Sequence, residues 1–442
     1  MVASRPPGPN GLPLLGNTLQ FVRGQEKFYE DAATHGDVAS LDLLGIGEHY
    51  LVSEPTLVER MLVSDRERFA KPSHTKAQLG ELLGQGLVLS EGELWRRQRG
   101  ATQPAFYRDR IATYAESMTA HAERTIERWD HGAMYDIEGE MKDLTLRILV
   151  ESMFGGEIDY EKRGIREMAR RLQVPGRPAM QPIANVVPKS VPIPMWQRYH
   201  EAIDEFDSIV YELIERRQKD ERDRDDLLSM LLGVGMDEKQ LRDEMMTLLF
   251  AGHETTALAL TYVWYLLARH PAVGERLRAE LDDVLDGRVP TMADLPDLEY
   301  TERVVKEAMR LYPPVPAIPR ETTSEIDLGG YSLPEGALVI ASQWVIHHDE
   351  RFYDDPYAFR PERWSEGFEE RLPEFAYFPF GGGPRRCIGA GFAMIEAQLI
   401  LATIAREYEL QLVGDDSLDL AVGITLFPMT ELELRVVDRE KR

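Results

Sequence analysis

The chain has 442 residues, of which 43% are hydrophobic and 29% charged, so it can bury a large core beneath a solvated surface. Its net charge of −25 argues against nucleic acid as a partner, because proteins that bind nucleic acid carry basic patches. About ten of the 51 basic residues are lysine, and acids are spread along the whole chain. This charge suits high salt, where counter-ions screen self-repulsion, and we hypothesise a halophilic protein; an ordinary solvated negative surface is the alternative.

The first twenty residues predict no secretory leader, because they lack a continuous apolar run and carry four prolines. The most apolar stretch, residues 257–267, is too short to cross a bilayer and is typical of a buried helix. We therefore expect a soluble, cytoplasmic protein without a membrane span.

Residues 38–44 and 48–54 alternate between apolar and polar side chains, which predicts two paired strands. Residues 55–63 follow with a helical pattern. The segment from Pro72 to Ser90 is Gly-rich and weakly periodic, so we expect a loop there.

Trp95 and Arg99 lie four residues apart and therefore on one face of a predicted helix. An ordinary amphipathic surface helix would give the same pattern. Residues 111–154 are also helical in pattern. Residues 172–196 then hold six prolines among apolar side chains, which is consistent with a mobile lip over an apolar cavity or with an irregular connector.

Asp237 and Gln240 resemble a capping box at the start of a helix that nothing interrupts before Pro271. About thirty helical residues span roughly 45 Å, enough to cross a domain. Near the middle, Ala251 and Gly252 share one face with Thr255. A glycine within a helix costs about 1 kcal/mol relative to alanine, so a dioxygen molecule or a flat cofactor against this face would give it a reason.

Three interpretations compete for this stretch. A zinc site of the H-E-x-x-H type fails, because His253-Glu254 is followed by Ala257 where the second histidine belongs. Thr255 could simply bond back to a helix carbonyl. Alternatively, Glu254 is a functional acid, since an unpaired carboxyl in an apolar helix is costly.

Glu307 and Arg310 form an E-x-x-R pair on a predicted helix, and Arg363 follows in the segment FRPERW. Alone, such a pair is weak evidence, because chance ion pairs are common. Residues 327–340 predict a hairpin turning at residues 334–336. The adjacent His347 and His348 could suggest a metal, but we favour a structural role.

The stretch FGGGPRRCIG, residues 380–389, contains Cys387, the only cysteine of the chain. A lone cysteine forms no internal disulfide, and zinc would require more sulfur or histidine ligands. Arginines at 385 and 386, together with a predicted helix beginning near Gly389, favour a thiolate at Cys387. A buried structural cysteine is the alternative.

The spacing of Phe380, Gly383, Arg385, Cys387 and Gly389 resembles the haem-binding signature of the cytochrome P-450 family. Residues 251–255 match the family's A-G-x-[D/E]-T motif, and E-x-x-R and P-E-R-W also occur in the family's order. The resemblance covers nearly the whole chain. It implies a mainly α fold with a small β-rich lobe, here a single domain over residues 1–442 with neither a fused reductase nor an anchor.

The resemblance also implies roles for individual residues. Cys387 would be the axial ligand of haem b iron, the arrangement known for thiolate-ligated haem, with Phe380 and Gly389 in its loop. In the long helix, Ala251 and Gly252 would lie against the haem, Thr255 would hydrogen-bond dioxygen, and Glu254 would relay protons. The haem propionates would be bound by Trp95, Arg99, Arg320 and Arg385. Glu307, Arg310 and Arg363 would form a buried network that supports the cysteine loop, and Ala317-Ile318 would face substrate.

The implied reaction is mono-oxygenation of an apolar substrate by O2, with electrons from a separate partner, a ferredoxin with its reductase. Arg96, Arg97 and Arg386 could form a basic patch for that partner, or could merely offset local acids. A peroxide-driven peroxygenase and a haem-based sensor or carrier are the rivals. The retained Glu254-Thr255 pair argues against both, because neither requires this route for protons.

Overall fold

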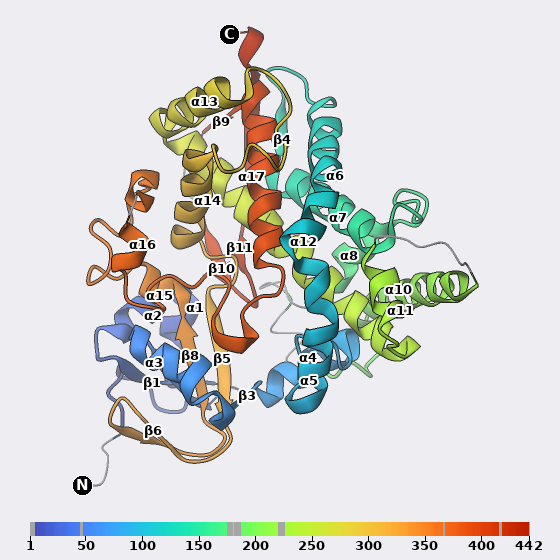
Figure 1. The fold of residues 1–442 in the computed structure, drawn as a ribbon. Coiled ribbons are helices and arrows are strands. Elements are labelled where there is room, and N and C mark those ends of the chain that lie inside the picture. Colours follow the sequence, from blue (N-terminus) through green and yellow to red (C-terminus); the bar gives the residue numbers. More distant parts are fainter. Residues whose placement is uncertain are drawn as a thin grey trace. The chain divides into compact units, whose positions relative to one another are not determined.

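The computed structural model describes residues 5–44, 47–174, 180, 187–219, 226–365, 367–414 and 418–441. Figure 1 shows them as a ribbon coloured along the sequence. The chain divides into two compact units. The first unit comprises residues 1–78, 306–390 and 424–426, and the second comprises residues 79–305, 391–423 and 427–442. Residues 175–179 and 181–186 of the proline-rich stretch 172–196 lie outside the described residues, so the predicted lip over a cavity stays a prediction.

The first unit contains a sheet, a hairpin and short helices. Its strands are β1 (Val38–Leu43), β2 (Gly47–Val52), β3 (Phe69–Ala70), β5 (Ala317–Thr322), β6 (Ile326–Leu328), β7 (Tyr331–Leu333) and β8 (Leu338–Ser342). Its helices are α1 (Thr18–Arg23), α2 (Gln25–Ala33), α3 (Pro55–Glu59), α15 (Gln343–His347) and α16 (Phe368–Arg371). Single turns are η1 (Arg60–Ser64), η2 (Arg66–Arg68), η5 (Pro361–Trp364) and η6 (Gly383–Arg385).

The main sheet has the strand order β1-β2-β8-β5-β3. β1 and β2 pair antiparallel with Val38 opposite Val52, which confirms the strand pair predicted from alternation. β2 and β8 run parallel, so residues nearly 300 positions apart in the chain lie side by side. Val38, Val52 and Val339 are buried in one core with Leu328, because β-branched side chains pack well on a pleated surface.

The hairpin predicted to turn at residues 334–336 turns elsewhere. β6 and β7 pair through the dipeptide Gly329-Gly330, whose φ angles of +63° and +83° suit only residues without a side chain. Residues 334–336 instead lead into β8, which pairs with β2 and β5. The prediction was wrong because two adjacent glycines make a tighter turn than Pro334-Glu335-Gly336.

The second unit is mainly helical. Its helices are α5 (Gly92–Thr102), α6 (Arg108–Ile126), α7 (Ile137–Phe154), α8 (Ile165–Gln173), α10 (Pro194–Gln218), α11 (Leu227–Gly233), α12 (Glu238–Arg269) and α13 (Pro271–Leu285). Helices α4 (Ser73–Leu83), α14 (Glu299–Leu311) and α17 (Ala390–Glu407) each contribute residues to both units. Short turns are η3 (Gln103–Phe106) and η7 (Arg439–Lys441), and the strands are β4 (Met134–Asp136), β9 (Tyr408–Leu412), β10 (Leu420–Val422) and β12 (Glu433–Asp438). Strand β11 (Leu426–Pro428) contributes residues to both units.

Helix α12 is the central helix of the second unit. It begins where the sequence predicted, since the Asp237 carboxylate accepts a hydrogen bond from the Gln240 amide at 2.8 Å. It ends at Arg269, before Pro271. Nearly every side chain from Leu241 to Leu267 is buried, and α7 packs along it. Because almost all of this helix is buried, any of its side chains that remain partly exposed mark a candidate binding surface.

The loop predicted over residues 72–90 is partly wrong, because residues Ser73–Leu83 form helix α4. Leu79, Leu82 and Leu83 recur at helical spacing and pack into the core of the second unit. Gly80 obscured the pattern in the sequence, but a Cβ there would meet nothing within 4 Å, so the glycine sits at an open position. Residues 84–91 remain a loop.

Among the described residues, no helix is both long enough and apolar enough to span a membrane. The stretch 257–267 is instead the buried C-terminal half of α12, as expected.

Candidate functional site

Cys387 lies in an exposed position on the loop between η6 and helix α17, which begins three residues later. Its backbone amide donates a hydrogen bond to the Phe380 carbonyl at 2.9 Å, and the Arg386 amide donates to Gly383 at 3.1 Å. These bonds close the loop on itself and fix the backbone that carries the sulfur. The alternative of a buried structural cysteine is therefore wrong.

The three glycines before Cys387 shape this loop by packing. Gly381 and Gly383 have φ angles of +67° and +64°, in the left-handed region that glycine adopts without strain. A Cβ on Gly382 would lie 2.0 Å from the Phe375 ring, and one on Gly383 would lie 2.4 Å from the Leu62 carbonyl oxygen. The glycines thus let the loop approach its own unit closely.

Behind the loop, Glu307 is the centre of a buried ion network. Its carboxylate receives two hydrogen bonds from Arg310, both at 2.9 Å, and one from Arg363 at 3.3 Å. The Trp364 indole donates a further bond to Glu307 at 2.8 Å. The structure therefore brings together all three residues of the predicted network, and adds Trp364, the last residue of the FRPERW segment.

The network continues to the cysteine loop through His347. Arg310 donates to the His347 carbonyl at 2.7 Å, and the His347 Nε2 accepts from the Phe378 amide at 3.2 Å. Phe378 lies two residues before Phe380, so the chain of contacts reaches the loop that holds Cys387. Burial lowers the pKa of His347 well below its usual value, which keeps the ring neutral and able to accept. The described residues contain no group of three or more side chains that could hold a metal ion.

Arg320 and Arg385 belong to the same unit as Cys387. Arg320 lies on strand β5 and Arg385 in turn η6, and both side chains are half-buried. One Arg320 N–H donates to the Pro319 carbonyl at 2.9 Å. Their proposed contact with carboxylates of a cofactor stays a prediction.

In the second unit, a small open face interrupts the buried surface of α12. Phe250, Ala251, Gly252 and Thr255 are partly exposed, whereas the residues around them are buried. Three of these four are the residues that the sequence placed on one face. A strip of small side chains that stays open on a buried helix fits a flat apolar ligand.

Thr255 and Glu254 differ in their surroundings. The Thr255 hydroxyl donates to the Ala251 carbonyl at 2.8 Å, the back-bond foreseen as a structural alternative, and its lone pairs can still accept a hydrogen bond. Glu254 is 4% exposed, and its Oε1 lies 3.9 Å from Nζ of Lys142 on α7. The costly acid is thus partly compensated by a cation, and Lys142 in turn hydrogen-bonds Glu138.

Gly252 has a packing reason as well. A Cβ at this position would lie 3.1 Å from a methyl group of Leu149 on α7, closer than ordinary contact. The missing side chain therefore lets α7 approach α12. Its predicted place beside a cofactor is a separate matter and stays a prediction.

His253 is a buried structural residue. Its Nδ1–H donates to the Leu249 carbonyl at 2.7 Å, and its Nε2 accepts from the Gln173 amide group at 2.9 Å. Burial lowers its pKa to about 4, so it is neutral near pH 7. With both nitrogens occupied, His253 offers no lone pair to a metal, which agrees with the failed zinc motif.

Trp95 and Arg99 are both half-buried on helix α5, one turn apart as predicted. An indole N–H and a guanidinium on one helix face can together bind a carboxylate.

Within each unit, the residues fit the haem that the sequence implies. The first unit offers an exposed cysteine sulfur on a constrained loop and two half-buried arginines, Arg320 and Arg385. The second offers an open face of small side chains on α12, together with Trp95 and Arg99 on α5. A soft thiolate ligand, guanidiniums for propionates and a small apolar face match the chemistry of this group.

Sequence reasoning missed Glu396 on helix α17. It is 2% exposed, and its carboxyl group hydrogen-bonds the hydroxyl of Thr256, the residue after Thr255. Burial raises its pKa to about 8. An acidic residue inside the apolar run 393–405 was the available signal.

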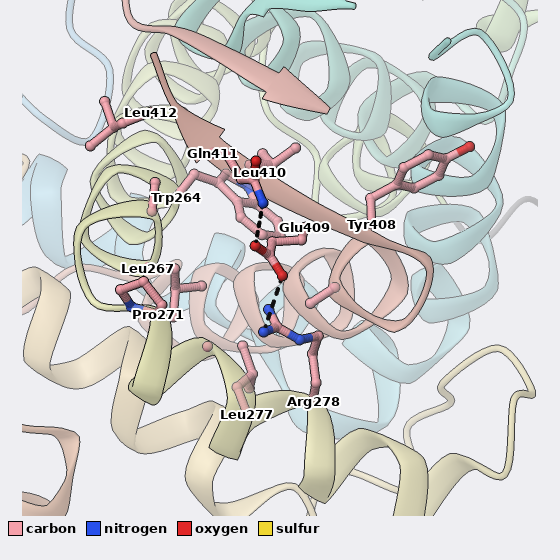
Figure 2. A pocket seen from close by; sticks show the side chains of 13 residues that line it. Trp264, Leu267, Pro271, Leu277, Arg278, Tyr408, Glu409, Leu410, Gln411 and Leu412 are labelled. Carbon is pink, nitrogen blue, oxygen red and sulfur yellow. Dashed lines mark hydrogen bonds and ion pairs between the residues drawn. The ribbon is translucent and has the colours of Figure 1, made fainter. Parts of the chain in front are cut away.

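A separate cavity of about 210 Å³ lies in the second unit, at the C-terminal end of α12 (Figure 2). Arg278 and Glu409 form an ion pair of 3.2 Å in its wall, and Gln411 donates to Glu409 at 2.7 Å. Trp264, which also lines it, is nine residues beyond Thr255, or roughly 13 Å along the helix. None of the predicted site residues lines this cavity.

Comparisons with known proteins agree with these features. The sequence matches the family described as Cytochrome P450 over residues 6–431. It is 36% identical over 419 residues to "Cyclooctat-9-en-7-ol 5-monooxygenase" of Streptomyces melanosporofaciens, covering 93% of this chain and 90% of that protein. It is 31% identical to "Pentalenene oxygenase" of Streptomyces avermitilis, covering 98% and 97% of the two chains.

The fold is similar to that in the "Crystal structure of cytochrome P450DA heme domain". The TM-score is 0.86 at 26% sequence identity, and the match covers 99% of each chain. This likeness confirms the predicted fold class, mainly helical with small sheets.

Proposed function

This chain belongs to the cytochrome P450 family and is a haem-dependent monooxygenase, and we propose that its Cys387 thiolate is the axial ligand of the haem iron. The enzyme inserts one oxygen atom of O2 into an organic substrate and takes electrons from a separate redox partner. The observation that carries the ligand assignment is the exposure of the chain's only cysteine on a loop closed by its own backbone hydrogen bonds. When bound, a thiolate-ligated haem supplies the cleavage of the O–O bond.

The remaining residues hold the cofactor and move protons. Trp95 and Arg99 of the second unit, and Arg320 and Arg385 of the first, would bind haem propionates, while Ala251 and Gly252 would leave room for a flat ring. Thr255 offers its hydroxyl to dioxygen. Glu254 passes protons to it, supplied from the surface through Lys142 and Glu138 on α7. Since 3.9 Å is too long for a hydrogen bond, a water molecule or a small side-chain movement would join Lys142 to Glu254.

The names of the relatives suggest a substrate class. One relative is named for an unsaturated cyclic alcohol and another for an alkene. We propose that this enzyme likewise oxidises an apolar, unsaturated cyclic compound. Apolar residues that the family would use, such as Ala317 and Ile318, are half-buried on β5.

The electron donor is proposed to be a ferredoxin with its reductase. Arg97 in the second unit and Arg386 in the first are each exposed, and each would attract an acidic protein. Arg96 is exposed too, but it hydrogen-bonds Glu93, which supports the view that this arginine offsets a local acid. A cytoplasmic location and adaptation to high salt are further proposals, supported by the net charge of −25.

Replacement of the axial ligand tests the assignment. In Cys387→Ser, the reduced carbon monoxide complex should lose the Soret position of the wild-type protein, because an alkoxide or alcohol ligand donates less charge than a thiolate. A variant that keeps the wild-type position would show that Cys387 is not the ligand. Titration of the ferric wild-type protein with cyclic alkenes, fatty acids and steroids, read from the spin-state shift, then tests the substrate class.

A further inference from the structure

Two acidic residues of α12 accept hydrogen bonds from the backbone of the short segment 84–87, which connects helices α4 and α5. The Asp243 carboxylate accepts the Gln85 amide at 2.8 Å, and the Glu244 carboxyl group accepts the Leu87 amide at 3.1 Å. Both acids are buried, with exposures of 2% and 0%. Two buried side chains therefore satisfy two backbone donors of a loop that has no regular structure of its own.

The glycines of this segment fit the two acids. A Cβ on Gly84 would lie 2.2 Å from the Asp243 carboxylate, and Gly84 has a φ of +52°. A Cβ on Gly86 would lie 1.9 Å from the hydroxyl oxygen of Thr247, also on α12. The G-Q-G sequence thus allows the backbone to lie directly on this part of the helix.

The same segment also contacts helix α5. Gln98 is fully buried, and its side-chain amide donates to the Gln85 carbonyl at 2.6 Å. Gln98 immediately precedes Arg99 and lies three residues after Trp95. The segment therefore joins α12 to the helix that carries both of these residues.

We propose that Glu244, together with Asp243, is a positioning residue of the monooxygenase, which holds the segment 84–87 against α12 and thereby places Trp95 and Arg99 for the haem propionates. The inference rests on the proposed function, since it requires these two side chains to bind the cofactor. Glu244 itself acts only through the segment and touches neither substrate nor haem.

The surroundings of Glu244 indicate which protonation state of its carboxyl group is favoured when it binds the segment. Burial and, secondarily, the charge of Asp243 raise its pKa, and the Leu87 amide lowers it, with a net value of about 7. The cations facing this end of α12, Arg242 and Lys239, pair with Asp243. Arg242 also pairs with Asp207.

The protonated acid retains an oxygen that accepts from Leu87 and gains an O–H donor. The Gln98 Oε1 and the Thr247 Oγ1, both buried, have no hydrogen-bond partner among the described residues. The second oxygen of Glu244, Oε1, likewise has no hydrogen-bond partner among them. Because burial beneath the segment raises the pKa of Glu244 above its usual value, the held segment favours the protonated acid, and a rise in pH through about 7 loosens it.

Two variants of Glu244 test the proposal in the haem-loaded protein. Glu244→Leu removes both oxygens, and Glu244→Gln mimics the protonated acid. Glu238→Gln, an exposed change on the first turn of α12, is the matched control. Hydrogen exchange of the amides at 85 and 87 reports on the segment. The rate of haem transfer to apomyoglobin, measured from pH 6 to pH 9, reports on cofactor retention.

We expect amide exchange at 85 and 87 at least tenfold faster in Glu244→Leu, with haem transfer accelerated severalfold. Wild-type haem transfer should accelerate as the pH rises through about 7, and Glu244→Gln should be slow without that step. Should Glu244→Leu fail to fold, the missing step in Glu244→Gln decides. Unchanged amide exchange in Glu244→Leu, or an unchanged pH step in Glu244→Gln, overturns the proposal.

The proposed function fails in a different way. If Arg99→Leu retains haem as well as the wild type does, the assignment of Arg99 to the propionates is wrong, whatever Glu244 does. Faster amide exchange with unchanged haem transfer in Glu244→Leu would overturn the positioning role while leaving the assignment of Arg99 intact.

Discussion

Glu396 on α17 shares a hydrogen bond with the hydroxyl of Thr256 on α12, and that hydroxyl also donates to the Gly252 carbonyl at 3.1 Å. Burial raises the pKa of the Glu396 carboxyl group to about 8, although its bond to Thr256 acts to lower it. These two bonds connect α17 through Thr256 to the backbone of residues 251–255.

Glu396 makes stability depend on pH. Its pKa rises from 4.5 in the unfolded chain to about 8 in the folded protein, so between these values the folded state binds the extra proton. The free energy of unfolding should therefore fall as pH rises through this window, by up to about 1.4 kcal/mol per pH unit from this residue. Glu396→Gln should flatten its share of the slope and raise the melting temperature at pH 9. Equal slopes in the variant and wild type would contradict this assignment, and the exposed change Glu407→Gln is the control.

Glu254, the acid of the A-G-x-[D/E]-T motif at residues 251–255, should control the rate of turnover. Glu254→Gln cannot release a proton, so we expect kcat to fall by about 10²-fold with little change in substrate affinity. Lys142→Met removes the neighbouring cation and should give a smaller fall. Steady-state kinetics with matched spectral titrations measure both, and an unchanged kcat in Glu254→Gln would remove this residue from the proton route.

The Thr255 hydroxyl should determine how efficiently electrons reach product. Thr255→Val keeps the shape of the side chain but removes the group offered to dioxygen, so the ratio of product to consumed NAD(P)H should fall severalfold. Hydrogen peroxide should rise in compensation. Thr256→Val, which changes the adjacent hydroxyl on the buried side, separates this effect from a general loss of helix stability. An unchanged ratio of product to NAD(P)H in Thr255→Val would mean that the Thr255 hydroxyl has only the structural role of bonding the Ala251 carbonyl.

The buried network around Glu307 should be essential for folding. Glu307→Gln leaves Arg310 and Arg363 without their counter-charge, and breaking such a pair costs about 3–5 kcal/mol. Thermal or urea unfolding measures the loss. Glu369→Gln, which removes only a more exposed partner of Lys306, should cost less than about 1 kcal/mol. A similar effect in both variants would be evidence against the network.

Gly252 can be tested by a pair of substitutions. Gly252→Ala gains about 1 kcal/mol of helix propensity but forces a methyl group towards Leu149, and overpacking costs about 1–3 kcal/mol. Combination with Leu149→Ala should relieve the clash. A double-mutant cycle of unfolding free energies should then show coupling of at least about 0.5 kcal/mol, and strict additivity would mean that α7 does not restrict this position.

Motifs of close spacing were predictable from the sequence, because their geometry is local. Cys387 and its glycines, the E-x-x-R pair and the face shared by Ala251 and Thr255 each depend on a few neighbouring residues. Contacts between distant segments were not predictable. No pattern in the sequence connects Glu396 with Thr256, 140 residues earlier, or joins the amide of Leu87 to Glu244.

The predictions for helix α4 and for the hairpin were wrong for a different reason. In both, glycine was given one meaning when it has several: Gly80 is a tolerated interruption on an open helix face, whereas Gly329-Gly330 makes a turn. Only the surrounding packing distinguishes these cases. The same is true of Gly252, because close packing of Leu149 on α7 is by itself a sufficient reason for a glycine at this position.

The glycine loop before Cys387 sets the limits for changing the enzyme by substitution. At positions 382 and 383 even a methyl group would meet the Phe375 ring or the Leu62 backbone, so randomised libraries there would mainly yield proteins that lose the loop. Pro384, by contrast, has an exposed side chain within the same turn. Diversity intended to alter the cysteine's surroundings is therefore best introduced at Pro384, where a new side chain can point to solvent without separating the loop from its support.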